Sequence, residues 1–246
     1  MKVLDIKYLE RKDDFLVIDN EKYKVIFSTA EDGKNFNRHT DDGVKTLLDL
    51  KDEFDVNDVI YLRQVHSDTV YVYEGDKRDD FIENEGDAIV TNDKNVIVGV
   101  FTADCVPVIL VDEENNVISA IHSGWKGTFN CITKKAIDKM KRVYGTDPKN
   151  IKAYIGPHIR QCCYEVSEEL KDRFISEKNI DATKLFKGRN LNMEICIEKD
   201  LLDSGVDDEN IYSLGLCTYC SDEIKLHSYR KSGGSYGRLF SFVVLK

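Results

Sequence analysis

The sequence of 246 residues lacks an excess of positive charge, long apolar runs and proline: 35 Lys and Arg stand against 45 Asp and Glu, and three residues are Pro. The net charge of −10 argues against a nucleic-acid-binding surface, which needs clustered cations. The longest apolar stretch, from Val96 to Val111, is interrupted by Asp104 and is shorter than the ~20 residues of a membrane-spanning helix. The charged start, MKVLDIKYLERKDD, lacks the apolar core of an export signal. We therefore expect a cytoplasmic protein without nucleic-acid or membrane partners.

The chain also lacks features that divide a protein into domains or mark common nucleotide sites. No repeat, low-complexity run or Pro-rich linker interrupts it, and it holds no Walker A loop, dinucleotide fingerprint or H-E-x-x-H motif. Its hydrophobic share of 41% is enough for a sizeable core. We therefore expect one domain over residues 1–246.

Short β-branched runs and a few segments with helical periodicity define the expected secondary structure. The β-branched runs predict strands at Phe15–Ile18, Tyr23–Ser28, Val59–Val65, Val70–Tyr73, Ala88–Thr91, Val96–Thr102, Val106–Val111, Val117–Ile121, Ile151–Ile155 and Leu239–Leu245, the third and fourth as a pair. Helices are predicted for residues 44–54, Phe129–Val143, Glu165–Ile175 and Glu194–Leu202. Strands clustered between isolated helices favour an α+β fold, a single domain of mixed β-sheets layered with α-helices.

Seven cysteines without an export signal indicate reduced thiols, some of which pack as small hydrophobes and some of which bind metal or react. Cys217 and Cys220 form half of a zinc-ribbon pattern, and no second C-x-x-C completes it. Cys162 and Cys163 are adjacent, so we do not expect both sulfurs to reach one metal. These four cysteines are therefore expected to be dispensable for metal binding.

Other metal-binding residue types stand where predicted strands end. His66 and His122 each end a strand-like run, and Cys105 lies at the junction between two apolar strands. Two His and one Cys form a zinc set of the catalytic type, whose fourth position stays open for water or substrate. A His at a strand end is more often a hydrogen-bonded residue than a ligand. On the residues alone, both interpretations stay open.

Seven strings follow one another along the chain: RQVHSDTV, GDAIVTN, FTADCVPVILVD, AIHSGWKGT, IGPHIRQCCYEV, GLCTYC and SYRKSGGSYGR. From about Phe27 to the C-terminus the sequence thus resembles the YfiH/YlmD family, also called the laccase-domain or polyphenol-oxidase family. The resemblance implies a single domain of layered sheets and helices. It also implies a zinc ion held by the His of RQVHS, the Cys of TADC and the His of HSGW, which are His66, Cys105 and His122.

The resemblance further implies a purine nucleoside phosphorylase, a transferase that splits adenosine, inosine or methylthioadenosine with phosphate into free base and ribose 1-phosphate. Adenosine deamination, a hydrolase reaction, is implied as a second activity. The expected partners are therefore purine nucleosides and phosphate. A copper-dependent phenol oxidase, the older label of the family, is the alternative activity, and copper the alternative metal.

Candidate substrate contacts surround the expected metal site. Lys126 lies where a loop enters the helix predicted from Phe129, a position suited to phosphate, and Arg63 and Arg230 are further cations. Gln64 lies in the RQVHS string, and Asn37 lies in a segment that matches the family only loosely. For Lys126 and Arg63, a solvated side chain and a surface ion pair are equally plausible alternatives.

The chain departs from the family pattern at several positions. Lys126 and Lys231 stand where the family usually has Arg, and His158 stands where it often has a small residue or Cys. Asp104, next to Cys105, is either an acid–base group or a residue that orients its loop. Trp125 stacks on a purine in one interpretation and belongs to the core in the other.

Other mechanisms can be weighed by counting residues. Five histidines are too few for a multicopper laccase, and none of the three methionines lies near His66, Cys105 or His122 in sequence to complete a blue-copper site. Copper can still replace zinc at such a set. The H-x-E motif of cytidine deaminases is absent, because Ser and Gly follow His122. A structural zinc protein remains as an alternative, although three ligands argue against a closed structural site.

Overall fold

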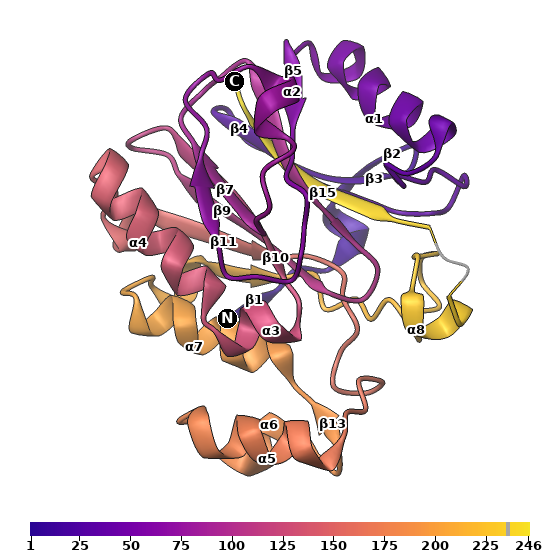
Figure 1. The fold of residues 1–246 in the computed structure, drawn as a ribbon, viewed down its shortest axis with the longest axis vertical. Coiled ribbons are helices and arrows are strands. Elements are labelled where there is room, and N and C mark those ends of the chain that lie inside the picture. Colours follow the sequence, from indigo (N-terminus) through magenta and orange to yellow (C-terminus); the bar gives the residue numbers. More distant parts are fainter. Residues whose placement is uncertain (235–236) are drawn as a thin grey trace.

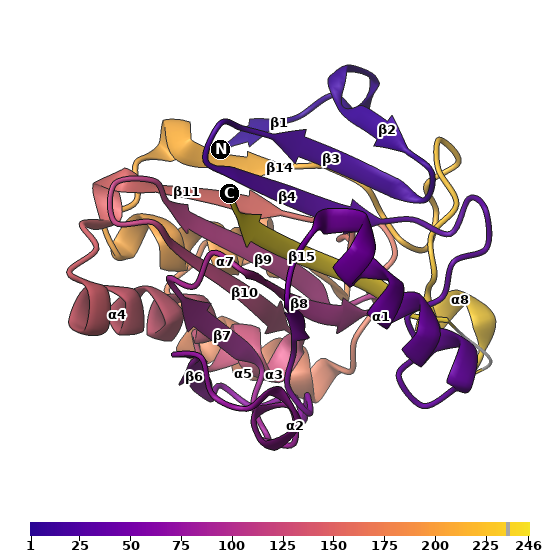
Figure 2. The same cartoon turned by 90° about the horizontal axis from the view of Figure 1, so that it is seen from above.

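The computed structural model describes residues 1–234 and 237–246, and within them two β-sheets pack face to face (Figures 1 and 2). The larger sheet has the strand order β1 (Lys2–Val3), β14 (Ile211–Ser213), β11 (Ile151–Ile155), β9 (Val106–Asp112), β10 (Val117–Ser123), β7 (Ala88–Thr91) and β6 (Val70–Val72). The smaller sheet has the order β2 (Glu10–Lys12), β3 (Phe15–Asp19), β4 (Tyr23–Ser28), β15 (Leu239–Leu245), β8 (Val96–Thr102) and β5 (Asp58–Ile60). A two-stranded ribbon pairs β12 (Phe186–Lys187) with β13 (Asn190–Leu191).

Strand β9 is apolar up to its last residue because both faces of the larger sheet are covered. Val108 packs against helices, whereas the next residue, Ile109, packs between the two sheets, because successive side chains of a strand point to opposite faces. Helices α4 (Ile132–Tyr144) and α7 (Met193–Asp203) cover the outer face of the larger sheet, and α1 (Asp41–Phe54) covers the smaller one (Figure 1). The order helix, sheet, sheet, helix confirms the α+β class.

The predicted pairing of Val59–Val65 with Val70–Tyr73 is wrong. The first strand ends at Ile60, and β5 pairs with β8 in the smaller sheet, while β6 pairs with β7 in the larger sheet. Residues 61–69 cross from one sheet to the other, so they cannot form a continuous strand. Residues 103–105, between β8 and β9, make a second crossing. These two crossings carry His66 and Cys105.

The helix predicted at Phe129–Val143 is divided in two. Helix α3 (Trp125–Phe129) follows β10 directly, and α4 begins at Ile132 after Cys131, whose backbone is left-handed with φ 58°. Helix α4 ends at Gly145, where φ is 71°, a conformation that glycine adopts without strain. Since α3 has only five residues, the loop after His122 leads into a single short turn of helix.

A side-chain cap sets the start of one further helix. Helix α5 (Glu168–Glu177) begins three residues later than predicted, because the Ser167 side chain accepts a hydrogen bond from the backbone of Leu170. Three short helices complete the described chain: α2 (Arg78–Phe81), α6 (Ala182–Leu185) and α8 (Tyr229–Ser232). Within the described residues, no helix combines the length and the apolar character that crossing a membrane requires.

Candidate metal centre

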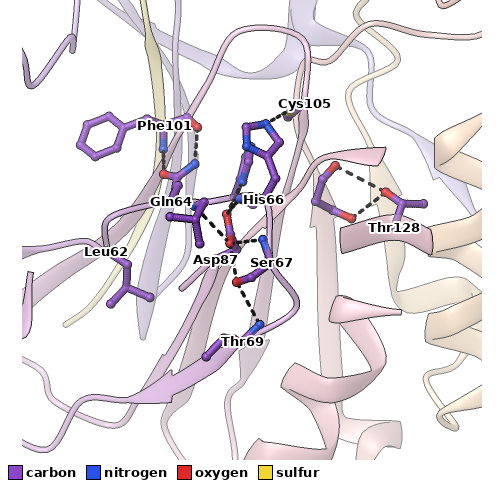
Figure 3. Close-up of polar contacts among 12 residues, drawn as sticks. Leu62, Gln64, His66, Ser67, Thr69, Asp87, Phe101, Cys105 and Thr128 are labelled. Carbon is purple, nitrogen blue, oxygen red and sulfur yellow. Dashed lines mark hydrogen bonds and ion pairs between the residues drawn. The ribbon is translucent and has the colours of Figure 1, made fainter. Parts of the chain in front are cut away.

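The three metal-binding candidates of the sequence meet at one place. Figure 3 shows two of them, His66 and Cys105, side by side. His66 lies in the crossing from β5 to β6, Cys105 in the crossing from β8 to β9, and His122 in β10. One ligand atom of each lies within 4.8 Å of the others, and 3.7 Å separates Nε2 of His66 from Sγ of Cys105. The two imidazole rings are steeply inclined, at 81°, with centroids 4.8 Å apart. His122 is buried, Cys105 half-buried and His66 exposed, so the set is open on one side.

Asp87, a fully buried carboxylate that was not among the expected site residues, holds this set in place. Its Oδ1 accepts hydrogen bonds from Nδ1 of His122 at 2.7 Å and from the backbone N–H of His66 at 3.1 Å. Its Oδ2 accepts from the backbone N–H and the hydroxyl of Ser67 (Figure 3). Because Nδ1 of His122 is engaged, Nε2 is the nitrogen left for a metal. Its sequence signal was its place in the string GDAIVTN, immediately before the buried strand Ala88–Thr91.

The backbone around the set is unusual at two positions, and a third lacks a side chain. His66 and Asp104 have positive φ angles, 58° and 94°, which are uncommon for residues with a Cβ. Gly124, which follows β10, leaves room for the ligands: a Cβ there would lie 2.8 Å from Cδ2 of His66 and 3.2 Å from Sγ of Cys105. Any other residue at position 124 would therefore displace a ligand side chain.

Neighbouring charges favour the thiolate form of Cys105. Burial alone raises the pKa of this thiol, but the imidazoles of His122 and His66 outweigh burial and lower the pKa to about 6. Burial lowers the pKa of His122, yet Cys105 and Asp87 outweigh it and raise this pKa to about 9. Burial also raises the pKa of Asp87, but hydrogen bonds from His122 and Ser67 bring it below the usual value. Without metal, the site is a thiolate–imidazolium pair near neutral pH.

The chemistry of the donor set fits a transition metal. Two imidazole nitrogens and one thiolate suit zinc or copper, and a bound metal displaces the proton of the imidazolium. The open side of the set faces a cavity of about 460 Å³, within the range of small-molecule sites. Aromatic side chains contribute much of its wall: Phe36, Phe101, Trp125, Tyr164 and Tyr229.

The expected substrate contacts fall into two groups. The cavity wall includes Asn37, Gln64, Asp104 and Arg230. Arg63 is not among the lining residues: its half-exposed guanidinium forms an ion pair with Glu85 at 2.5 Å. Lys126 does not line the cavity either. Its side chain is exposed, and its ammonium lies 5.7 Å from the centre of the Trp125 ring.

Two of the lining residues have their polar atoms engaged within the protein. The Gln64 amide donates to the backbone carbonyl of Phe101 at 2.8 Å and accepts from its N–H at 2.7 Å (Figure 3). The Asp104 carboxylate accepts from the hydroxyl of Thr218 at 2.6 Å and from the backbone N–H of Arg230 at 2.7 Å. Of the two interpretations of Asp104, this geometry favours the orientation of loops.

Sequence patterns did not reveal two further arginines of the cavity wall, Arg38 and Arg238. Arg38 donates to the backbone carbonyl of Leu62 at 3.1 Å, and its guanidinium lies 5.9 Å from the centre of the Phe101 ring. The two arginines are 200 positions apart in sequence, and a hydrogen bond from the backbone N–H of Phe36 to the carbonyl of Arg238 joins their segments. Arg238 ends the string SYRKSGGSYGR, but no single motif contains both arginines.

A second group of ligand-type side chains contradicts an expectation from the sequence. The sulfurs of Cys162, Cys163, Cys217 and Cys220 all lie within 4.8 Å of one another. The expectation that these two pairs form no four-ligand set is therefore wrong. Adjacent residues point to opposite faces only in an extended strand, whereas Cys162 and Cys163 lie in a turn.

Comparisons with known proteins agree with the family resemblance of the motifs. The family model described as multi-copper polyphenol oxidoreductase laccase matches residues 29–246. A purine nucleoside phosphorylase of Clostridium acetobutylicum is 45% identical over 243 residues, which cover 99% of this chain and 100% of that protein. An adenosine deaminase named RL5, from an unknown prokaryotic organism, is 32% identical over 203 residues, which cover 78% of this chain and 77% of that protein.

The fold also matches a solved structure. The crystal structure of the hypothetical protein YfiH from Bacillus licheniformis superposes with a TM-score of 0.87 and 24% identity, and the match covers 96% of this chain and 97% of that chain. This match confirms the layered α+β architecture. Because the family model covers most of the sequence and a relative is 45% identical along almost all of it, the chain belongs to the laccase-like YfiH family, as its motifs implied.

Proposed function

We propose that the protein is a zinc-dependent purine nucleoside phosphorylase that cleaves adenosine, inosine or methylthioadenosine with phosphate into free base and ribose 1-phosphate, or 5-methylthioribose 1-phosphate in the case of methylthioadenosine. The observation that carries this proposal is the 45% identity to the phosphorylase of Clostridium acetobutylicum over 99% of the chain. It is supported by a cavity of suitable size that joins a His–Cys–His set, aromatic walls and arginines.

In this proposal His66, Cys105 and His122 hold the zinc ion, and Asp87 is a positioning residue that acts through His122. A zinc ion bound by such a set supplies a Lewis acid that polarises an oxygen atom of substrate or water. One thiolate among the ligands leaves the centre with a formal charge of +1. The protein provides the remaining functions: it binds the purine, holds phosphate and excludes water.

Aromatic side chains suit the purine. Phe101, Trp125 and Tyr164 all line the cavity, and their rings offer faces and edges for a heterocycle. Burial raises the pKa of Tyr164, and the neighbouring Cys105 raises it further. The phenol therefore stays protonated at neutral pH, and its Oη can donate a hydrogen bond to a bound nucleoside.

The three arginines of the wall, Arg38, Arg230 and Arg238, suit the phosphate ion. In phosphorolysis a phosphate oxygen forms a bond to C1′ of the sugar while the bond from C1′ to the purine nitrogen breaks. The purine leaves with the bonding electrons and takes up a proton. Holding phosphate and sugar in line lowers the barrier, because the reacting atoms no longer have to meet by diffusion.

Chromatography of the products with and without phosphate tests the proposal. With phosphate we expect free base and ribose 1-phosphate, and without phosphate we expect neither. The Cys105→Ala variant should lose zinc from this centre and turnover together, while Cys131→Ser, which removes a cysteine outside the metal set, should keep both. Base release that is indifferent to phosphate would indicate hydrolysis and contradict the proposal.

Adenosine deamination is the second candidate, and the 32% identity to the adenosine deaminase RL5 favours it. The same chromatogram separates the two reactions, because deamination converts adenosine to inosine without releasing base. The phenol-oxidase alternative rests on the description of the family model and on the donor set, which also suits copper. Metal analysis of the purified protein, followed by a phenol assay of copper-loaded protein, decides between these metals.

A further inference from the structure

Four cysteines converge outside the cavity because of the sheet topology. Strands β11 and β14 are parallel neighbours, so the loops that follow them leave from the same edge of the larger sheet. The first loop carries Cys162 and Cys163, and the second carries Cys217 and Cys220. An isolated bridge between His158 and Cys217 extends the pairing beyond the strands.

Two turns then point the sulfurs inward. The backbone N–H groups of Cys163 and Tyr164 both donate to the carbonyl of Arg160, which curls the first loop. The N–H of Ser221 donates to the carbonyl of Cys217, which curls the second. All four thiols are free, and 3.5 Å separates the sulfurs of Cys162 and Cys220.

We propose that these four cysteines, which we call the four-cysteine cluster, bind a structural zinc ion that is separate from the His–Cys–His centre. A tetrahedral zinc ion with Zn–S bonds of about 2.3 Å needs sulfurs about 3.8 Å apart, and the observed sulfurs all lie within 4.8 Å of one another. The C-x-x-C spacing of Cys217 and Cys220 is a common zinc-binding spacing.

The environment of the buried sulfur supports a bound metal. The backbone N–H groups of Arg160, Cys220 and Tyr219 lie near Cys217 and favour its thiolate form, as N–H groups around metal-bound thiolates often do. Four thiolate ligands fill a tetrahedral zinc ion and leave no position for substrate. The four-cysteine cluster is therefore suited to a structural role.

The position of the cluster indicates what this zinc ion stabilises. Ile159 and Tyr164 flank the first cysteine pair in sequence and line the cavity. Thr218, between the second pair, donates the 2.6 Å hydrogen bond to Asp104, next to the ligand Cys105. A zinc ion in the four-cysteine cluster would therefore fasten two loops that build the cavity wall. This inference does not depend on the proposed reaction.

Zinc content per chain tests the proposal. We expect two zinc ions in the unmodified protein, one in Cys105→Ala, and one in the double variant Cys162→Ser with Cys220→Ser. The double variant changes the two exposed cysteines, so it removes no buried packing. Cys131→Ser is the matched control and should keep both ions. Unchanged zinc in the double variant would overturn the proposal.

Cobalt substitution gives a readout that is independent of activity and of zinc content. The intensity of sulfur-to-cobalt charge-transfer absorption rises with the number of thiolate ligands. Cobalt-loaded Cys105→Ala, which retains the four-cysteine cluster, should absorb more strongly than the cobalt-loaded double variant, whose remaining centre has one thiolate ligand. Equal spectra would contradict the proposal, and so would protein that is purified with one zinc ion and a Cys162–Cys220 disulfide.

Discussion

A single buried carboxylate controls which atoms of the His–Cys–His centre are free to bind metal. The left-handed backbone of His66 costs of order 1–3 kcal/mol. Asp87 offsets this cost, because each hydrogen bond to a charged group contributes about 1.5–3 kcal/mol and the carboxylate accepts several from His66, Ser67 and His122. The positions of His66 and His122 thus depend on a carboxylate that is not itself one of the three proposed ligands.

Replacement of Asp87 with Asn should lower zinc affinity about 10–100-fold, because His122 loses the charged partner that orients its ring. Competition with a chelating dye measures the affinity. Asp112→Asn is the matched control: Asp112 is equally buried and accepts two backbone N–H groups, but it lies at the far end of β9 from Cys105. Equal loss of affinity in both variants would contradict the role of Asp87.

In metal-free protein, alkylation of Cys105 should titrate with a midpoint near pH 6, because the lowered pKa of this thiol exposes its thiolate to the cavity. Burial and the thiols of Cys220 and Cys217 raise the pKa of Cys162 to about 11, so this exposed thiol is an internal control that should stay unreactive at pH 7. Peptide mapping after brief iodoacetamide treatment measures both.

The sign of the pH effect on stability follows from the same pKa. Folding lowers the pKa of the Cys105 thiol from its ordinary value of 9.0 to about 6. The contribution of this thiol to the free energy of unfolding is therefore full above pH 9 and is lost as the pH falls through about 6. A midpoint for Cys105 alkylation near pH 9 would contradict both expectations.

At the scale of elements, local patterns predicted the strands that are buried on both faces and failed where the chain changes sheets. The runs at Val96–Thr102 and Leu239–Leu245 match β8 and β15 residue for residue. The run at Val59–Val65 looks like one strand, but its second half crosses between the sheets. Helix Phe129–Val143 is broken at Cys131 by a left-handed residue that helical periodicity does not reveal.

Gly124, where β10 passes into α3, lets these elements approach the ligands. Gly124→Ala should lower zinc affinity at least tenfold with little change in melting temperature, because the new Cβ collides with His66 and Cys105 while φ stays at −70°. Gly145→Ala should instead lower the melting temperature and leave zinc affinity unchanged. A Cβ at position 145 would meet no atom within 4 Å, but the φ of 71° would strain an alanine and destabilise the fold by about 1 kcal/mol. Metal titration and thermal unfolding of both variants measure the contrast.

At the scale of the whole molecule, the functional site forms where distant segments meet. The meeting of His66, Cys105 and His122 was predictable because each lies in a short family motif of its own. Part of the cavity wall was predictable too, since Asn37, Gln64 and Arg230 line it as expected, whereas Arg38 and Arg238 were missed because their segments meet only in the fold. The four-cysteine cluster was missed for the same reason: a parallel pair of strands brings together two loops that lie more than fifty residues apart.

The meeting of arginines in this cavity makes a small cationic site in a protein of net charge −10. Arg38→Met keeps an unbranched side chain against Phe101 and removes the charge, so the KM for phosphate should rise about tenfold or more, the effect of one lost charge-assisted hydrogen bond. The KM for the nucleoside should change much less. Arg63→Met is the control, because Arg63 pairs with Glu85 outside the cavity and its loss should leave both constants unchanged. Initial rates at varied phosphate measure the difference. A larger rise in the KM for phosphate in Arg63→Met than in Arg38→Met would contradict this site and indicate that phosphate binds at Arg63, as the sequence suggested.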